Sequence, residues 1–341
     1  MIEIDGSLGE GGGQVLRSSL TLSTMTGQEF RIVNIRAKRK NPGLRHQHLN
    51  AVQAAAEICG ADVSGGKIGS QEITFFHGKI RAGKYRFDIG TAGSTSLVLQ
   101  TVLLPLSKAD EPSTVTITGG THVAWSPCFH YLDLNYLPFL WKVGLDVHLR
   151  MEKAGFYPNG GGQIRATIEP SKTISPLQLL RRGRLLEIRG ISAVANLARN
   201  IATRQRRQVI GCLGRRFPLN DIRVVDIPAP SPGSLILLLV EFEHSQVCYF
   251  ALGQKGKSAD KVADEAIGEF EAFIATDGVV DQYLADQLLL PLAFADGPSE
   301  IFTSQVTEHL VTNAEVIGAF IPVEIKIIGG IGDPGIVKII P

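Results

Sequence analysis

The sequence repeats one order of predicted elements three times, and this repeat restricts the possible folds more than any other feature. Each unit of about 80 residues has the order strand, helix, strand, helix, strand, strand, judged from hydrophobic periodicity and turn residues. The segments 103–118 (LLPLSKADEPSTVTIT) and 290–303 (LPLAFADGPSEIFT) are visibly alike and belong to the second and third units. Because each unit has a half-buried sheet that needs its neighbours, we predict an α/β (α+β) fold with three pseudo-symmetric β-α-β-α-β-β repeats.

The predicted helices carry many of the candidate functional residues described below. The first unit starts at Met1, the second at about Tyr85 and the third at about Val279. Glycines at positions 27 and 60 follow the last apolar residues of two helices, as is typical of helix ends. The predicted helices of the three units span Gln14–Thr26, Leu44–Cys59, Leu97–Leu106, Tyr131–Val143, Tyr283–Ala295 and Leu310–Phe320.

The stretch from Arg184 to Thr276 does not follow the repeat. Its pattern predicts a strand, a helix, three strands and a long helix, which is enough for a small α/β domain. We predict that this domain is inserted ahead of the third unit. The resulting division assigns residues 1–183 and 277–341 to the three-repeat catalytic domain, and residues 184–276 to the inserted domain.

Composition restricts the cellular context and the class of protein. The chain has 341 residues, 44% of them hydrophobic, and a net charge of +1, which argues against a protein that coats nucleic acid. The four cysteines are dispersed and form no C-x-x-C pair, so we expect reduced thiols in a cytoplasmic protein. No signal peptide and no apolar stretch of membrane-spanning length is found, and we expect no membrane contact.

A glycine-dense run near the N-terminus, Asp5–Arg17 (DGSLGEGGGQVLR), lies between a predicted strand and a predicted helix. Glycine allows backbone N–H groups to approach a phosphate closely, and a helix N-terminus adds partial positive charge. The run matches neither G-x-G-x-x-G nor the P-loop signature, so common nucleotide-binding loops are not indicated. An anion site and a plain tight turn both remain compatible with it.

The segment Arg31–His48 (RIVNIRAKRKNPGLRHQH) concentrates basic residues in an otherwise nearly neutral chain. A local positive field of this kind suits a phosphorylated substrate or the end of a nucleic acid, and the alternative is a solvated surface loop. Arginine suits phosphate because its planar guanidinium group can bind two oxygens. A second group of basic residues lies on the predicted helix of the inserted domain. It is compatible either with contact to RNA or with a solvated surface.

Two further stretches carry side chains that suit ligand binding or catalysis. At the start of a predicted helix, Tyr283, Asp286 and Gln287 share one face, which suits a nucleotide and its magnesium ion, while Asp281 can be an ordinary helix N-cap. His309 lies where a strand ends and the next helix begins. It is either a hydrogen-bonded bystander or a nucleophile that holds a transferred phosphoryl or nucleotidyl group.

Several of these motifs, in this order along the chain, resemble those of RNA 3′-terminal phosphate cyclases. They are GEGGGQVLR (9–17), IRA…R…PGL (35–44), QHL (47–49), GFYPNGGG (155–162), YLADQ (283–287) and HLVTN (309–313). The resemblance covers essentially the whole chain. It implies three repeats with an inserted domain, and ATP-dependent conversion of an RNA 3′-phosphate to a 2′,3′-cyclic phosphate through a covalent histidine–AMP and an adenylated RNA end.

The resemblance also implies a role for individual residues. His309 is the nucleophile, and Glu10 and Asp286 hold Mg²⁺ or Mn²⁺. ATP is bound by Gln100, Pro127, Tyr283, Asp286 and Gln287, with the adenine ring between Tyr283 and Pro127. The RNA end and its phosphate are bound by Gln14, Arg17, Arg36, Arg39, Gln47 and His48.

The expected partners and the alternatives follow from the same resemblance. RNA 3′-phosphate ends are the expected substrates, DNA ends are potential AMP acceptors, and a homodimer is compatible with the family. One alternative is a catalytically inactive cyclase-like factor in ribosome assembly, although the presence of His309, Asp286 and Glu10 disfavours it. The other is a carboxyvinyl transferase of related fold, which has no use for the residues around Tyr283 or for the inserted domain.

Overall fold

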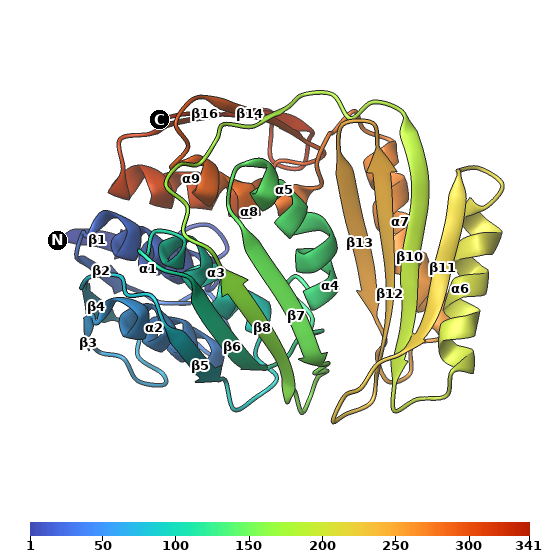
Figure 1. The fold of residues 1–341 in the computed structure, drawn as a ribbon, viewed down its shortest axis with the longest axis horizontal. Coiled ribbons are helices and arrows are strands. Elements are labelled where there is room, and N and C mark those ends of the chain that lie inside the picture. Colours follow the sequence, from blue (N-terminus) through green and yellow to red (C-terminus); the bar gives the residue numbers. More distant parts are fainter.

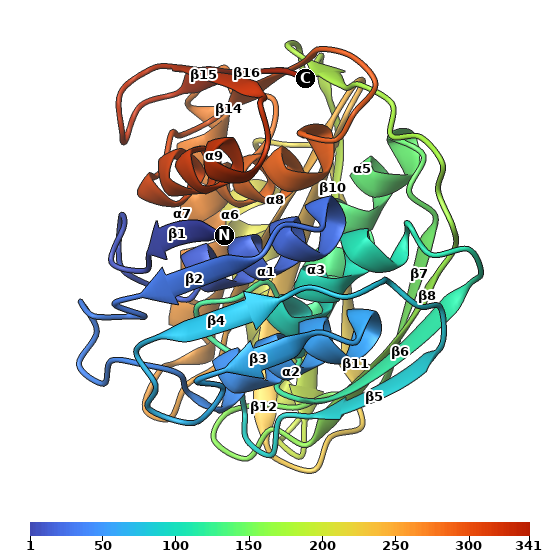
Figure 2. The same cartoon turned by 90° about the vertical axis from the view of Figure 1, so that its left-hand side faces the viewer.

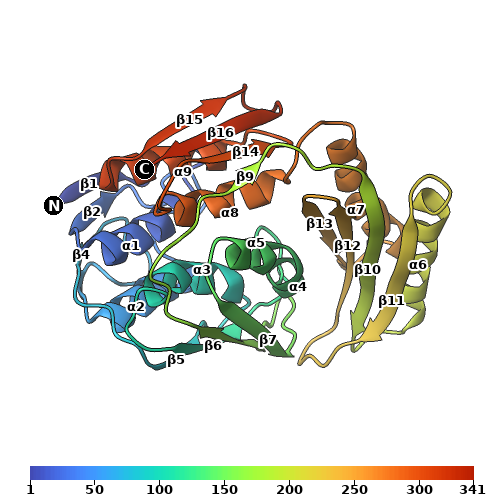
Figure 3. The ribbon, with the colours of Figure 1, turned by 45° about the horizontal axis from the view of Figure 1, so that its top comes forward.

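The computed structural model describes all 341 residues and contains four sheets of four strands each. Three of these sheets lie on the outside of one lobe, and the helices of that lobe pack together between them (Figure 3). The fourth sheet and its two helices form a second lobe beside the first (Figure 1). This mixed arrangement confirms the predicted α/β (α+β) fold class.

The three outer sheets have the same strand order. In each, the first and second strands in sequence are parallel neighbours, and the fourth strand lies antiparallel between the second and the third. Figure 2 shows the first of them, with β1, β2, β4 and β3 in spatial order. A symmetry axis that relates the three units stays a prediction.

The bounds of these twelve strands follow. The first sheet has β1 (Ile2–Asp5), β2 (Phe30–Val33), β3 (Asp62–Ser64) and β4 (Ile73–Phe76). The second has β5 (Lys84–Asp88), β6 (Ser113–Gly119), β7 (Val147–Lys153) and β8 (Gly162–Ile168). The third has β9 (Gln178–Leu179), β14 (Ser299–Thr303), β15 (Glu324–Ile328) and β16 (Gly335–Ile340).

The prediction that the extra segment precedes the third unit is wrong. Strand β9 pairs in parallel with β14, so it is the first strand of the third sheet, although 119 residues separate Leu179 from Ser299 in the sequence numbering. The extra segment therefore lies inside the third unit, between its first strand and its first helix. A strand of two residues is too short to show hydrophobic alternation, which explains why the sequence pattern did not reveal it.

The helices between the outer sheets begin and end close to the predicted residues. They are α1 (Gln14–Thr26), α2 (His46–Cys59), α3 (Thr95–Leu106), α4 (Phe129–Tyr131), α5 (Leu137–Lys142), α8 (Gln282–Leu292) and α9 (Glu308–Phe320). The single helix predicted for Tyr131–Val143 is instead α4, a π-helical turn η1 (Leu132–Tyr136) and α5. Apolar side chains from all three units bury one common core of 68 residues, to which one face of the extra segment's sheet also contributes Ile191, Ala193, Leu235, Leu237, Leu239 and Cys248.

The extra segment has its own sheet and its own core. Its strands are β10 (Leu185–Ala195), β11 (Leu219–Asp226), β12 (Gly233–Phe242) and β13 (Gln246–Leu252), and its helices are α6 (Asn200–Leu213) and α7 (Ala259–Ile274). A separate cluster of 17 buried residues fills the space between this sheet and these helices. The division into domains stays a prediction, and a second core is what it requires.

Two expectations from composition concern the whole chain. All four cysteines are free thiols, as predicted. None of the helices combines the length and the apolar character that crossing a membrane requires.

Candidate active site

His309 lies at the start of α9, in the second position of a 13-residue helix. The hydroxyl group of Thr307 accepts a hydrogen bond from the backbone N–H of Leu310 at 3.1 Å and caps this helix. Because the first N–H groups of a helix have no partner within it, this end carries partial positive charge. A phosphate beside His309 is therefore favoured by the local backbone.

Gln14, the first residue of α1, connects His309 with Asp286. Its side-chain nitrogen donates to Asp286 Oδ1 at 2.6 Å, and its side-chain oxygen lies 2.5 Å from His309 Nδ1. An amide oxygen only accepts, so Nδ1 of His309 must carry the proton. The other ring nitrogen, Nε2, then has a free lone pair. Gln14 was predicted to contact RNA, but in the structure its polar atoms are engaged with these two side chains.

Asp286 is held in place by a second amide that the sequence reasoning missed. Asn313 donates to Asp286 Oδ1 at 3.1 Å, and the hydroxyl group of Ser18 donates to Asn313 Oδ1 at 2.6 Å. Burial raises the pKa of Asp286, while His309 nearby and the two amide hydrogen bonds act in the opposite direction. His309 and Asn313 are four residues apart on α9, and this spacing was the available signal that both point to one site.

Glu10 approaches His309 from the glycine-dense run. Its Oε2 atom lies 3.5 Å from His309 Nε2 and 3.0 Å from a guanidinium nitrogen of Arg39. No group of three or more His, Cys, Asp or Glu side chains is arranged to hold a metal ion. Glu10 and Asp286 nevertheless supply carboxylate oxygens on the two sides of His309, and such oxygens suit Mg²⁺ or Mn²⁺ when phosphate oxygens complete the coordination. The binding of Mg²⁺ or Mn²⁺ by Glu10 and Asp286 stays a prediction.

Gly13, Arg17 and His48 form a cradle at the N-terminus of α1. A Cβ atom on Gly13 would lie 2.4 Å from His48 Nε2 and 2.7 Å from a guanidinium nitrogen of Arg17, so both groups converge on a space that only glycine leaves open. Burial and the positive charge of Arg17 lower the pKa of His48 to about 3. Burial also lowers the pKa of Arg17 to about 10, partly offset by Asp286. At neutral pH the cradle therefore has one cation and one neutral imidazole.

Two other residues predicted to bind RNA are engaged differently. Arg36 donates to the backbone oxygens of Asn41 and Gly43 at 2.8 and 2.9 Å, and so closes its own loop. Burial and the nearby guanidinium groups of other arginines lower the pKa of Arg36. The side-chain oxygen of Gln47 accepts a hydrogen bond from the backbone N–H of Ser94 at 2.8 Å. Gln47 thus links the first unit with the turn that precedes α3.

The residues predicted to bind ATP lie on two helices and one loop. Gln100 on α3 donates to Gln287 on α8 at 2.7 Å, so these two amides meet. Tyr283 is 45% exposed, and its hydroxyl group donates to Glu269 on α7 at 3.3 Å. Pro127 lies in the loop between β6 and α4. The polar groups of Tyr283 and Gln287 thus turn toward α7 and α3, and that of Asp286 toward α1 and α9, although the three residues share one side of α8 as predicted.

Asp281 is the N-cap of α8, as the sequence suggested. It is fully buried and accepts hydrogen bonds from the backbone N–H groups of Tyr283 and Leu284, at 3.0 and 2.8 Å. Tyr131 on α4 and Asn135 in η1 donate to the same carboxylate at 2.9 and 3.1 Å. Burial raises the pKa of Asp281 to about 6, although all four hydrogen bonds favour its charged form. This carboxylate ties the segment after Pro127 to the start of the helix that carries Tyr283.

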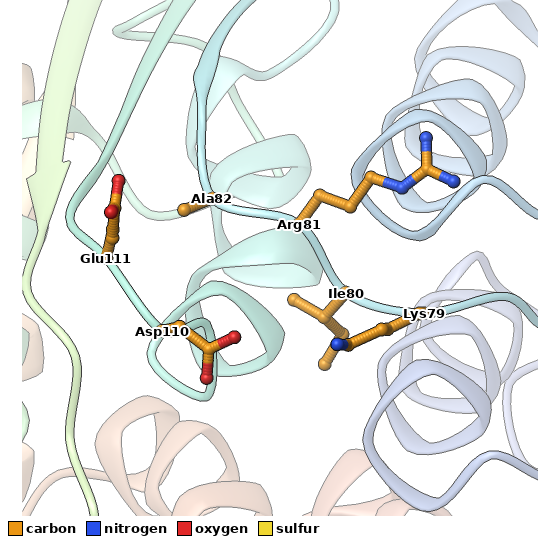
Figure 4. A pocket seen from close by; sticks show the side chains of 6 residues that line it. All are labelled: Lys79, Ile80, Arg81, Ala82, Asp110 and Glu111. Carbon is orange, nitrogen blue, oxygen red and sulfur yellow. The ribbon is translucent and has the colours of Figure 1, made fainter.

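A surface hollow elsewhere contains none of the predicted residues. It has a volume of about 390 Å³ and lies where the segment between β4 and β5 meets the turn after α3 (Figure 4). Its lining combines Lys79 and Arg81 with Asp110 and Glu111. We assign no role in the site to it.

Comparison with known proteins agrees with the motifs quoted above. A family model described as RNA 3′-terminal phosphate cyclase matches residues 8–327. Proteins named RNA 3′-terminal phosphate cyclase that resemble this chain come from Gloeothece citriformis (41% identity; 94% of this chain and 93% of the relative), Pseudomonas fluorescens (45%; 96% and 94%) and Methanopyrus kandleri (42%; 100% and 99%).

A structural comparison adds little to this. The enolpyruvyl transferase NikO from Streptomyces tendae aligns with 50% of this chain and 33% of its own, at 14% identity and a TM-score of 0.28. That likeness carries no argument, and the carboxyvinyl transferase alternative gains no support from it. The match over residues 8–327 and identities of 41 to 45% over almost complete chains decide the matter: this chain belongs to the RNA 3′-terminal phosphate cyclase family.

Proposed function

We propose that this protein uses ATP to convert an RNA 3′-terminal phosphate into a 2′,3′-cyclic phosphate, with His309 as the covalent carrier of AMP. The observation that carries the proposal is the contact between His309 Nδ1 and the side-chain oxygen of Gln14 at 2.5 Å. It leaves Nε2 as a nucleophile at a helix N-terminus, where a phosphate is favoured.

In the first step, the lone pair of His309 Nε2 attacks the α-phosphorus of ATP. The new N–P bond replaces the P–O bond to the β-phosphate, and pyrophosphate leaves. The proton on Nδ1 stays against the oxygen of Gln14 throughout. The imidazole needs no separate base because its attacking nitrogen already lacks a proton.

In the second step, an oxygen of the RNA 3′-phosphate attacks the phosphorus of the AMP, and the N–P bond to His309 breaks. In the third step, the vicinal 2′-hydroxyl group attacks the terminal RNA phosphorus, loses its proton and displaces AMP. A ribose end is therefore required for cyclisation. A DNA end lacks the 2′-hydroxyl group and would stop as the adenylated product.

The remaining residues have roles that follow from their charge and position. Glu10 and Asp286 would hold Mg²⁺ or Mn²⁺, which offsets charge on the phosphate oxygens. The guanidinium groups of Arg17 and Arg39, together with His48, would hold the terminal RNA phosphate, and Gln47 and Arg36 would shape the loops around it. Tyr283 and Pro127 would enclose the adenine ring, and Gln100 and Gln287 would bind the nucleotide by hydrogen bonds. All of these residues lie in the proposed three-repeat catalytic domain, 1–183 with 277–341.

The test is the formation of the covalent intermediate. With ATP labelled in the α-phosphate or the adenine, and with Mg²⁺ or Mn²⁺, the protein should acquire protein-bound AMP that is labile in acid and stable in alkali. This stability is typical of a phosphoramidate. The variant His309→Ala should acquire none. An adduct that persists in His309→Ala, or its absence from the wild-type protein, would refute the mechanism. In the second case, capture of ribosomal precursors without nucleotide turnover would point to a ribosome-assembly factor.

A further inference from the structure

Two aromatic side chains with no role in the proposed reaction stand out by their exposure. Trp125 is 100% exposed and Tyr157 is 79% exposed, which leaves both rings almost entirely in solvent. Trp125 also has a φ angle of 63°, in the left-handed region that bulky side chains rarely occupy. Because neither ring is buried, neither contributes to the packing of the core. The backbone at Trp125 is also held in a conformation that disfavours tryptophan. Such features indicate function more often than packing.

The two rings are carried by loops that are joined to each other. Trp125 lies in the loop between β6 and α4, and Tyr157 lies in the loop between β7 and β8. The backbone N–H groups of Thr121 and His122 both donate to the oxygen of Gly155, at 2.9 and 3.0 Å. The rings of His122 and Phe156 stack with their centroids 5.2 Å apart. The loops are therefore fixed relative to each other before any ligand binds.

These loops are also connected to the proposed phosphate-binding residues. The backbone N–H of Gly120 donates to the oxygen of Gly93 at 2.7 Å, and the next residue, Ser94, donates to the side chain of Gln47 at 2.8 Å. Gln47 precedes His48 in the cradle. The chain of contacts leads directly from the place proposed for the terminal phosphate to the loop that carries Trp125.

The strands that lead into the Tyr157 loop supply positive charge. Arg150 on β7 and Arg165 on β8 are register partners, so they lie side by side on the exposed face of the second sheet. Arg165 pairs with Glu152 at 3.1 Å, whereas Arg150 has no carboxylate within ion-pair distance. Exposed aromatic rings, with an unpaired cation on a strand that leads to one of them, are a combination by which proteins bind single-stranded nucleic acid, because bases stack on the rings and phosphates meet the cation.

We propose that Trp125 and Tyr157 form a stacking platform for the unpaired bases of the RNA that precede its 3′-terminal nucleotide. The inference rests on the proposed function, since the cradle must hold the RNA end for the preceding bases to reach these loops. The ligand is single-stranded RNA, and the platform is sequence-tolerant because every base has a flat face. It adds affinity for longer substrates without taking part in the reaction.

Fluorescence provides a direct test, because the chain has two tryptophans, Trp125 and Trp141. In the variant Trp141→Phe, all tryptophan emission comes from Trp125. Titration with a ten-nucleotide RNA that ends in a 3′-phosphate should quench this emission, and a nucleoside 3′-phosphate or ATP alone should not. Equal quenching by ATP alone would instead place Trp125 at the adenine ring and overturn the proposal. Quenching that follows protein concentration without RNA would show a contact between two copies of the chain and also overturn it.

Kinetics separate a binding role from a structural one. Trp125→Gly relieves the left-handed backbone, so the unfolding temperature should stay at the wild-type value while the ring is lost. We expect Trp125→Gly and Tyr157→Ala each to raise KM for the ten-nucleotide RNA about tenfold or more. The KM for a nucleoside 3′-phosphate and the rate of adenylation by ATP should not change. Phe76→Ala, which removes an exposed ring from the first sheet, is the matched control and should change none of these values.

The outcomes also distinguish this inference from the proposed function. If the wild-type protein forms no AMP adduct, the proposed function fails, whatever the RNA-binding result. If adenylation is normal and the KM for long RNA is unchanged in both variants, the platform is refuted and the proposed function stands.

Discussion

The contact between Gln14 and His309 makes a prediction that can be worked through in numbers. In Gln14→Met the side chain keeps its approximate length and volume but loses both polar atoms. His309 Nδ1 then loses its acceptor at 2.5 Å, and Asp286 loses one of its two amide donors. Loss of one hydrogen-bond partner at a partly buried site is worth about 1–3 kcal/mol. At 1.36 kcal/mol for each factor of ten, adenylation should slow by about 5- to 150-fold.

The reason for the loss is the position of one proton, and this can be measured. Nitrogen-15 NMR of labelled histidine should show the wild-type His309 with its proton on Nδ1, and a mixture of both neutral tautomers in Gln14→Met. Ser19→Ala is a suitable control, because Ser19 is buried in the same helix and its hydroxyl group bonds only to the backbone oxygen of Val15. A wild-type His309 with its proton on Nε2, or a Gln14→Met variant with normal adenylation, would refute the argument.

Three other substitutions test other parts of the site. Glu10→Ala should abolish adenylation while leaving the unfolding temperature unchanged, because a side chain that is 43% exposed contributes little to stability; a measured loss of stability without loss of adenylation would show a plain turn residue. Gly13→Ala places a methyl group 2.4 Å from His48 Nε2 and should raise KM for an RNA 3′-phosphate about tenfold, since a charge-assisted hydrogen bond in the cradle is lost; the check is steady-state kinetics with RNA varied. Asp281→Asn removes a carboxyl whose pKa burial raises to about 6 from an ordinary 3.8. The folded wild type therefore holds a proton more tightly than the unfolded chain between these values, and the contribution of this carboxyl to the free energy of unfolding falls by about 2 kcal/mol as pH rises from 4 to 7. In the asparagine variant, the free energy of unfolding measured by chemical denaturation at pH 4 and pH 7 should lack this fall. Its new amide can donate to Asn135 Oδ1, which has no partner in the wild type. The same dependence of unfolding free energy on pH in both proteins would contradict the argument.

The secondary structure was predicted well because its signals are local. Helix α1 has the predicted bounds Gln14–Thr26, and helix α2 ends at Cys59 as predicted. In both, a clear hydrophobic period is bounded by turn residues, so residues within the element decide its limits. The first strand of the third unit was not predicted, for the opposite reason. Strand β9 has two residues and exists because β14 pairs with it, which is information from elsewhere in the chain.

The sequence predicted which residues form the site better than it predicted the hydrogen bonds between them. Resemblance to a family indicated His309, Asp286 and Gln14, and the structure brings these three together. It could not show that Gln14 bonds to the other two, because 295 positions separate Gln14 from His309 and the contact depends on how α1 packs against α9. Asn313 was within reach of sequence reasoning, since it follows His309 by one helical turn.

The place of the inserted segment explains how it can influence one side of the site and leave the other alone. The segment enters after β9 and returns just before α8, and Arg182 holds the two crossings together by donating to the backbone oxygen of Gly278 at 3.1 Å. Of the hydrogen bonds made by the predicted site residues, the one that reaches this segment joins Tyr283 to Glu269. The phosphate cradle and His309 have their partners in the three-repeat part of the chain. A change in the inserted segment should therefore act first on binding of the adenine ring, and only through α8 on the chemistry at His309.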